Sequence, residues 1–266
     1  MKAKFSLEIS PKQVEKIKDL PKDIVDDIYI TYIPGASPQD IINASETILN
    51  YGFTPIPHCP ARTIPDEEFF INYLDGLIKI GVIKILIIGG SISNPKGRFS
   101  SSIDLLNTGL IQQSKIKTVN IAGHPEGNPD DKNHFENMIE KSKWLNTNNI
   151  QSNIVTQWCL SPDITNSWIN KTKSHLGKIG VKSEIHLGIA GPAKLTTILK
   201  YAKICGVSAT TSVFMKQGLD IRKIINHNPD NILNSLIGYD KLHIYPFGGI
   251  NEFLKWYKNT NIKEVF

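Results

Sequence analysis

The chain has 266 residues, 40 % of them hydrophobic and 21 % charged, which argues against disorder, a collagen-like repeat and a disulfide scaffold. A net charge of +5 without a clustered basic stripe argues against a nucleic-acid partner. The three cysteines lack CxxC spacing, and no apolar run reaches the roughly 18 residues of a membrane span. We therefore expect a cytoplasmic protein with reduced cysteines and no membrane contact.

Eight short β-rich segments follow one another, with helical patterns between them. The strands are expected at residues 5–9, 28–33, 54–57, 83–88, 118–122, 154–158, 184–189 and 241–245. A helix is expected to begin at the N-cap Ser37, and another is expected to run from Pro65 to Gly81. Further helices are expected at 103–110, 135–145, 164–176, 195–205 and 250–257, with an additional one around 221–236.

This alternation predicts a parallel sheet, because parallel neighbours need a crossover connection and a helix is its usual form. Eight such units over about 250 residues match the size of a (β/α)8 barrel. The predicted fold is an α/β (β/α)8 TIM barrel that spans residues 1–266 as a single domain. An open doubly wound sheet is the alternative, although no GxGxxG or P-loop motif supports it. Exposed apolar helix faces are compatible with a homo-oligomer.

Polar residues stand at the ends of most predicted strands. In a barrel the chemistry lies at the carboxyl ends of the strands. The polar residues expected there are Glu8, Thr31, His58, Ser91 after Gly90, His124, Gln157 and Tyr245. A single polar group at a strand end often only satisfies loop backbone. Together, however, these residues outline one polar cup.

Glu8 is flanked by Leu7 and Ile9 in the first strand, where alternation points it into the barrel mouth. Burial there would raise its pKa. A carboxyl group tuned in this way delivers a proton at neutral pH, so we expect Glu8 to be a general acid. The alternative is a buried ion pair with a lysine or arginine.

The two histidines and the glutamine suit a bound organic molecule better than a metal. A metal site needs three or four ligands, and the neighbouring Cys59 points away from His58 along its strand. No metal is therefore expected. Hydrogen bonding to a cofactor is the hypothesis for His58 and His124, and recognition of an amide-like heterocycle is the hypothesis for Gln157. The alternative for all three is that they hold loops together.

Several motifs carry a family likeness. They are Phe5-Ser6-Leu7-Glu8 with Pro11, Ile30-Thr31-Tyr32, Pro57-His58, Gly89-Gly90-Ser91, His124-Pro125-Glu126-Gly127-Asn128-Pro129, Thr156-Gln157 and His243-Ile244-Tyr245. In order and spacing they resemble the catalytic domain of methylenetetrahydrofolate reductase, over nearly the whole chain. The resemblance implies a flavoprotein oxidoreductase of one-carbon metabolism. It would use FAD, take NADH or NADPH as co-substrate, and interconvert methylenetetrahydrofolate and methyltetrahydrofolate.

The resemblance also implies roles for single residues. Glu8 matches the family's general acid, while Gln157 and Tyr245 match folate-binding positions. The positions that match flavin-binding residues are Thr31, His58, Gly90, Ser91, His124, Glu136 and Lys143. Glu136 and Lys143 fall on the helix after the fifth strand, where the family has an acid for the ribose or adenosine and a lysine for phosphate. A solvated helix face is the alternative for these two residues.

The chain departs from the family at the end of the fourth strand, where Gly89-Gly90-Ser91 replaces the usual Arg-Gly-Asp. The missing carboxylate would stabilise positive charge on the folate. The missing arginine would hold diphosphate, for which Lys96 and Arg98 are candidate substitutes. Two other functions therefore stay open. One is a flavin-free folate-binding protein or folate-dependent one-carbon or methyl transferase, and the other is a hydrolase or lyase on the same barrel.

Overall fold

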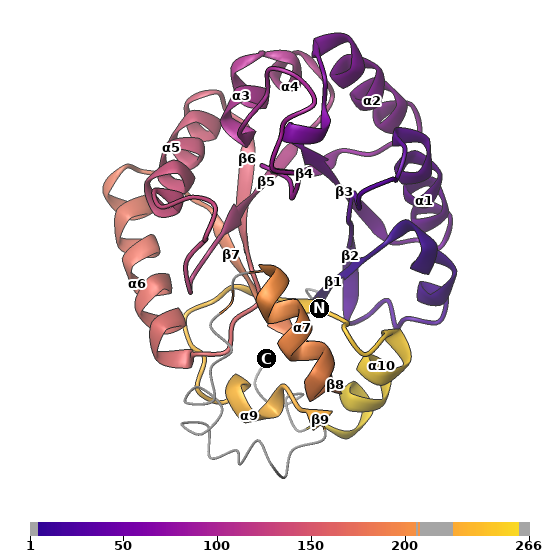
Figure 1. Ribbon diagram of the computed structural model, residues 1–266, viewed down its shortest axis with the longest axis vertical. Helices are drawn as coiled ribbons and strands as arrows, with labels where there is room; N and C mark the ends of the chain where they lie inside the picture. Colours follow the sequence, from indigo (N-terminus) through magenta and orange to yellow (C-terminus); the bar gives the residue numbers. More distant parts are fainter. Residues whose placement is uncertain (1–4, 206, 208–225, 261–266) are drawn as a thin grey trace.

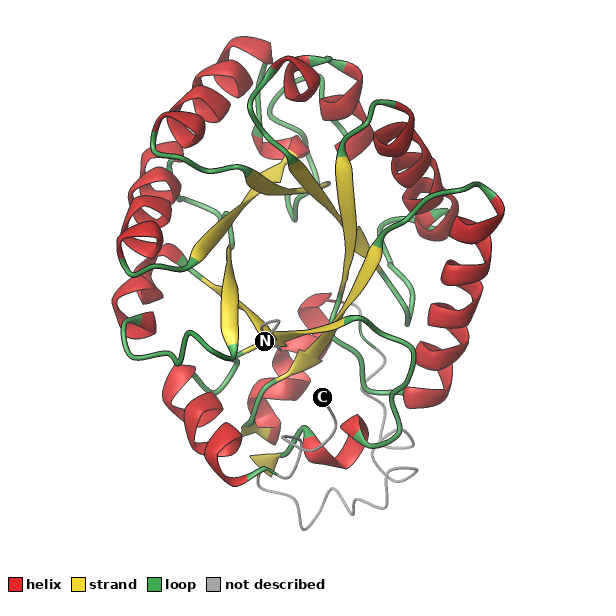
Figure 2. Ribbon diagram, turned by 180° about the vertical axis from the view of Figure 1, so that it is seen from behind, coloured by secondary structure: helices red, strands yellow, loops and turns green. Residues whose placement is uncertain are grey.

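The computed structural model describes residues 5–205, 207 and 226–260. Its main strands pair in parallel and close into a barrel in the order β1-β10-β7-β6-β5-β4-β3-β2. The ring of strands lies inside a ring of helices (Figure 1; Figure 2). The barrel strands are β1 Phe5–Ile9, β2 Val25–Ile30, β3 Thr54–Pro60, β4 Lys84–Ile88, β5 Thr118–Gly123, β6 Gln151–Thr156, β7 Glu184–Ala190 and β10 Lys241–Tyr245. The predicted TIM-barrel fold is confirmed.

The connections supply the outer layer. Its longer helices are α1 Pro38–Asn50, α2 Glu67–Lys79, α5 His134–Thr147, α6 Pro162–Lys178, α7 Leu195–Cys205 and α10 Ile250–Asn259. The shorter elements are η1 Pro11–Ile17, η2 Ala61–Thr63, α3 Ser102–Asn107, α4 Leu110–Gln113, α9 Asp230–Leu233 and the pair β8 Ala193–Lys194 and β9 Asn226–His227. Helix α1 begins where the sequence predicts, because Ser37 accepts a hydrogen bond from the backbone N–H of Asp40.

Some predicted bounds differ from the structure. Strand β2 covers Val25–Ile30 rather than 28–33. The strand begins with Val25, Asp26 and Asp27, and two adjacent aspartates are not typical of a buried strand. In the structure Asp27 is nevertheless buried, because it pairs with lysines. The helix predicted at 103–110 is divided into α3 and α4 by Gly109, whose φ of 73° belongs to the left-handed region that ends a helix.

The additional helix expected around 221–236 falls partly on residues outside the described part of the chain. The remainder is not a continuous helix, since β9 at Asn226–His227 is followed by the short α9 at Asp230–Leu233. Pro229 lies between them, and the residue before a proline is disfavoured in helical conformation. The hydrophobic spacing of this segment was therefore misleading.

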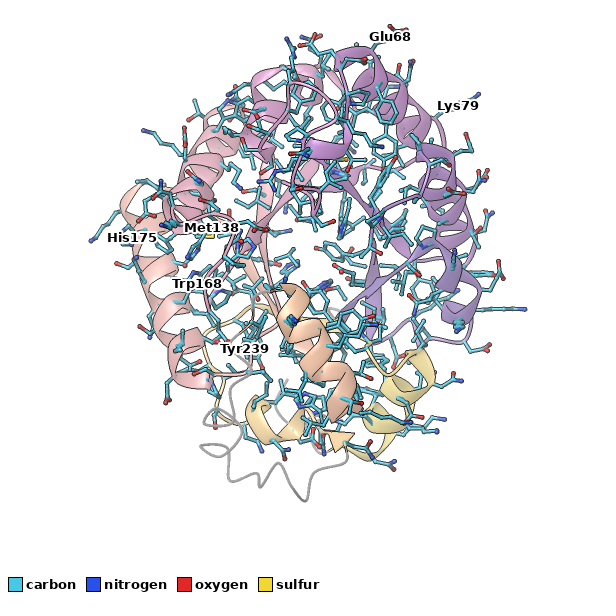
Figure 3. The ribbon with its side chains drawn as sticks, in the orientation of Figure 1. Glu68, Lys79, Met138, Trp168, His175 and Tyr239 are labelled. Atoms are coloured by element: carbon cyan, nitrogen blue, oxygen red, sulfur yellow. The ribbon has the colours of Figure 1, made fainter. Side chains whose placement is uncertain are left out.

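The main apolar core lies between the barrel and its helices. Met138 on α5 and Trp168 on α6 are buried on the barrel-facing side, whereas Glu68 and Lys79 on α2 point outward (Figure 3). Among the described residues no helix is long and apolar enough to cross a membrane. Inside the barrel, by contrast, many buried side chains are polar, and this polar interior leads to the site.

Candidate active site

A cavity of about 1050 Å³ opens at the carboxyl ends of the barrel strands. Most of the predicted site residues line it, namely Glu8, Thr31, His58, Gly90, Ser91, His124, Gln157 and Tyr245. The polar cup expected from the sequence is therefore one continuous cleft. Its volume is at the upper end of the range for small-molecule sites, so the cleft has room for more than one aromatic ligand or for one long ligand.

Glu136 and Lys143 do not reach this cleft. Both are exposed on α5, while His134, Asn137 and Lys141 on the same helix line the cavity. A helix turns about 100° per residue, so an error of one or two residues in register moves a side chain to the outer face. The flavin-binding roles assigned to Glu136 and Lys143 therefore have no support in the geometry.

Glu8 lies between two imidazoles at the bottom of the cleft. Its Oε2 is 3.4 Å from Nε2 of His58 and 3.5 Å from Nε2 of His243. His243 is fully buried, and its Nδ1 is 3.0 Å from the hydroxyl of Ser6. Strands β1, β3 and β10 thus bring together a carboxylate and two histidines, rather than the carboxylate and lysine or arginine that the sequence offered as the alternative.

The pKa of Glu8 is lowered, contrary to the expectation. Burial raises it, but the charge of His58 and hydrogen bonding by His243 and His58 outweigh burial and bring the pKa to about 2. The sequence predicted the desolvation correctly and missed the two imidazoles. Glu8 is therefore a carboxylate at neutral pH and does not itself hold the proton of a general acid.

This shift predicts acid sensitivity. A carboxyl group whose folded-state pKa is depressed from 4.5 to about 2 stabilises the fold above pH 4.5, and this contribution is lost as the pH falls toward 2. We expect the free energy of unfolding of Glu8→Gln to vary less between pH 4.5 and 2 than that of the wild type. Urea unfolding at several pH values measures this, and equal slopes for the two proteins would contradict the assignment.

Gln157 lies directly after β6, and its amide group is held in place. Its Oε1 accepts a hydrogen bond of 3.1 Å from the backbone N–H of Trp158, so the glutamine is in part the loop clamp considered as its alternative. It nevertheless lines the cleft. The hydroxyl of Tyr245 donates to the carbonyl of Thr156 at 3.0 Å, which ties the ends of β10 and β6 together beside it.

An aromatic wall continues from Tyr245 toward α7. The rings of Tyr201 and Phe247 stack with centroids 4.2 Å apart and planes at 12°, and Phe247 also stacks on Tyr245 at 5.8 Å. All three residues line the cavity. Flat rings on one wall and polar groups at the bottom suit a planar, hydrogen-bonding heterocycle.

Arg62 in η2, which follows β3, contacts the loop that follows β4. Its Nε donates to the carbonyl of Ser100 at 2.9 Å, and its Nη1 lies 3.4 Å from the carbonyl of Gly90. Arg62 and Lys96 both line the cleft. Arg98, in contrast, pairs with Glu67 and is largely exposed. Of the two substitutes that the sequence offered for the missing arginine, only Lys96 reaches the cleft.

The far end of the cleft is formed by α5 and the β5–α5 loop. Lys141 donates a hydrogen bond of 3.1 Å to the hydroxyl of Ser102, and burial lowers the pKa of its ammonium group although Asp131 and Glu140 partly oppose this. Burial also lowers the pKa of His124 to about 4, with further contributions from His134 and Lys141. His124 is therefore a neutral imidazole at pH 7.

Four further residues of the site had no role predicted from the sequence, namely His243, Ser6, Arg62 and Lys141. Two of them carried a usable signal. His243 is two residues before Tyr245 in β10, so alternation places both on one face of the strand. Lys141 follows His134 by seven residues on α5, which places both on one side of the helix. Arg62 had no such signal, because its position depends on how the loop after β3 folds.

Among the described residues no group of three or more ligating side chains is arranged to hold a metal ion.

No family model matches the chain. A solved structure that is similar over 99 % of this chain and 96 % of its own has a TM-score of 0.67 and 14 % identity. It is a Clostridium thermocellum protein that binds two copies of 5-methyl-5,6,7,8-tetrahydrofolic acid. N-acetylneuraminate lyase from Fusobacterium nucleatum matches 99 % of this chain and 78 % of its own, with 12 % identity and a TM-score of 0.49. The likeness to the Clostridium thermocellum protein shows that the two chains share a fold.

Proposed function

We propose that the cleft binds a reduced folate and that the protein interconverts methylenetetrahydrofolate and methyltetrahydrofolate with a flavin cofactor. The observation that carries this proposal is that the Glu8 carboxylate and the Gln157 amide line one cleft beside an aromatic wall. A pterin is planar and has an amide-like edge, which such a site would stack and hydrogen-bond. The methyltetrahydrofolate bound by the similar Clostridium thermocellum protein supports this ligand class.

Glu8 would act through its charge. The one-carbon unit of the folate carries positive charge when its five-membered ring opens to an iminium, and a fixed carboxylate stabilises that charge. The family's aspartate at the end of the fourth strand is replaced here by Ser91. The pair of imidazoles keeps Glu8 ionised, so Glu8 would supply the negative charge that position 91 lacks.

The role of His243 would be to hold Glu8 in place, since His243 is fully buried and is not among the residues that line the cleft. Its Nδ1 lies 3.0 Å from the Ser6 hydroxyl, which is also 3.4 Å from the carbonyl of Leu242, and its Nε2 lies 3.5 Å from Glu8. Glu8 is thereby fixed between His243 and His58, and His58 itself lines the cleft. In this proposal water in the cleft would supply the proton of the ring-opening step, while Gln157 orients the ring of the folate.

The cleft has features that fit a flavin dinucleotide. The basic side chains of Arg62, Lys96 and Lys141 line it, and the backbone at Gly89 is open, since a Cβ there would meet nothing within 4 Å. Thr31 and His58 line the inner part of the same cleft. When bound, the flavin would exchange a hydride equivalent with nicotinamide and folate in turn. These three basic side chains would hold its diphosphate.

The two lysines of α5 test whether these basic side chains hold the flavin. Lys141→Met should weaken flavin binding at least tenfold, because an ammonium group that lines the cleft is lost. Lys143→Met is the matched control, since Lys143 is exposed on the other side of the same helix, and its affinity should stay within twofold of the wild type. Fluorescence titration with FAD measures both. Equal weakening by the two variants would place the cofactor elsewhere.

Ser91→Asp restores the carboxylate of the family pattern. A negative charge beside the bound flavin should make the flavin harder to reduce, which lowers its reduction potential. Folate turnover should rise, because the carboxylate stabilises positive charge on the folate. Spectroelectrochemical titration of the variant and the wild type measures the potential. An unchanged potential would show that the turn after β4 does not face the flavin.

A second function is favoured by a specific observation. The turn Gly89-Gly90-Ser91 lacks both charged residues of the family pattern, and the similar Clostridium thermocellum protein holds two folates. A flavin-free folate-binding protein or folate-dependent one-carbon transferase would need neither residue. Calorimetry with methyltetrahydrofolate and FAD in separate titrations distinguishes the two functions, because the flavin-free protein gives heat with the folate alone.

The visible spectrum of the purified protein tests the leading proposal. We expect a yellow protein, or one that turns yellow with added FAD, whose flavin absorbance is bleached by NADH, NADPH or methyltetrahydrofolate. A colourless protein that binds no FAD but binds methyltetrahydrofolate would establish the second function instead. A protein that binds neither would contradict both.

A further inference from the structure

The barrel interior beneath the cleft holds a hydrogen-bonded chain of polar side chains. Barrel interiors are normally filled with bulky apolar residues, and buried polar groups are unfavourable unless they are hydrogen-bonded. Here Tyr29 and Asn120 are completely buried and His186 is 3 % exposed. These residues come from β2, β5 and β7, which lie on different sides of the barrel.

The donors of this chain all point the same way. Asn153 donates to Asn120 at 3.1 Å, and Asn120 donates to the Tyr29 hydroxyl at 3.0 Å. Nε2 of His186 is 3.2 Å from the Glu184 carboxylate, which can only accept, so Nε2 carries the proton. In the neutral imidazole Nδ1 of His186 is then an acceptor, and the Tyr29 hydroxyl, which is 3.5 Å away, donates to it. The chain therefore runs from Asn153 to Glu184, whose side chain is 41 % exposed.

The ring of Tyr29 lies against both imidazoles that bracket Glu8. Its centroid is 4.6 Å from that of His243 and 6.5 Å from that of His58, with edge-to-face angles of 72° and 74°. The ring of His243 also packs edge-to-face against that of Tyr245, with centroids 4.8 Å apart. The hydroxyl of Tyr29 is part of the hydrogen-bonded chain of side chains, and its ring packs against His243 and His58. The orientation of the phenol therefore links this chain of side chains to the two imidazoles beside Glu8.

Three carboxylates act on the phenol of Tyr29 through their charge, namely Asp27, Glu8 and Asp26. Burial and these carboxylates raise the pKa of Tyr29 well above its ordinary value. The phenol therefore stays neutral and keeps the proton that it donates to His186. A neutral donor with a fixed direction suits a positioning role.

We propose that Tyr29 is a positioning residue that holds His243 and His58 against Glu8, and that the hydrogen-bonded chain ending at Glu184 fixes Tyr29. Its effect on turnover rests on the proposed function, whereas its effect on the two imidazoles does not. A residue near the opposite end of β7 from the cleft thereby contributes to the geometry of the site without touching a ligand.

Three variants test this chain. Tyr29→Phe removes the hydroxyl and keeps the ring, Glu184→Ala removes the terminal acceptor, and Glu184→Gln keeps an acceptor at the same place. The first measurement is the ¹⁵N spectrum of the histidine rings of the ligand-free protein at pH 7. We expect the His243 and His58 signals to shift in Tyr29→Phe and in Glu184→Ala. Glu184→Gln should stay close to the wild type. Tyr51→Phe, which removes an exposed phenol hydroxyl, is the control.

The second measurement is folate turnover. Tyr29→Phe should lower kcat roughly tenfold while KM stays within twofold, because the ligand contacts are intact and only the reacting geometry changes. Glu184→Ala should change kcat in the same direction, and Glu184→Gln should restore it. Unchanged His243 and His58 signals in Tyr29→Phe would overturn the proposal. If the wild type turns over no folate, the proposed function fails and the ring spectra still decide on the positioning role. If Tyr29→Phe does not fold, the two Glu184 variants decide on it in the same way.

Discussion

Glu8→Gln is expected to lower folate turnover by roughly 10²-fold, the magnitude typical of removing a fixed charge or a proton-transfer group from an active site. The amide has nearly the size of the carboxylate and keeps a polar oxygen beside His58 and His243. It cannot, however, stabilise positive charge on the one-carbon unit. Reduction of the flavin by nicotinamide does not involve that charge and should stay near the wild-type rate.

Stopped-flow measurement of the two half-reactions separates these effects. Glu68→Gln is the control, because this carboxylate points outward from α2 (Figure 3) and should leave both rates unchanged. Equal loss in both half-reactions of Glu8→Gln would indicate a structural defect in the cleft. Full folate turnover would remove Glu8 from the mechanism.

Lys241→Met is expected to destabilise the protein by about 3–5 kcal/mol, the typical effect of removing one partner of a buried ion pair. Lys241 is 6 % exposed and lies 2.8 Å from Asp27, which is 5 % exposed. Lys241 also pairs with Asp26. The ammonium group of Lys84, at 2.9 Å from Asp27, would remain but is itself partly exposed. The variant would therefore leave Asp27 with incomplete compensation inside the barrel.

Urea denaturation gives the change in the free energy of unfolding. Lys255→Met is the matched control, because Lys255 forms an exposed ion pair with Glu252, and such pairs contribute about 1 kcal/mol or less. The double variant Lys241→Met with Asp27→Asn should recover part of the loss, since the buried charge is then removed as well. A loss no larger than that of the control would show that this ion cluster is not a determinant of stability.

The fold was predictable because strand and helix patterns are local. The segment 5–9 and the N-cap Ser37 carry their signals in a few adjacent residues, and both were correct. Strand β2 was misplaced because a buried aspartate reads as a loop until its lysine partners from β4 and β10 are known. Those partners are distant in sequence, so no local pattern could reveal them.

The site was predictable in outline for the same reason. Alternation and barrel topology were enough to bring Glu8 and Gln157 to one cleft. The protonation of Glu8 was not predictable, because it depends on His243, more than two hundred residues away in sequence. The residues of α5 that line the cleft were not predicted, because the rotation of the helix about its axis was misjudged. Lys141 rather than Lys143 reaches the cleft, and a rotation of this size is within the error of placing a helix from its sequence.

Calorimetric titration with 5-methyltetrahydrofolate, on the wild type and on Gln157→Leu, measures whether a reduced folate binds at the mouth of the barrel. Folate seated against Glu8 and Gln157 should give saturable heat with the wild type. The dissociation constant should rise at least tenfold in Gln157→Leu, which corresponds to about 1.4 kcal/mol for the lost hydrogen bonding. No heat with the wild type, or equal affinity for both proteins, would contradict a folate held at the mouth of this barrel.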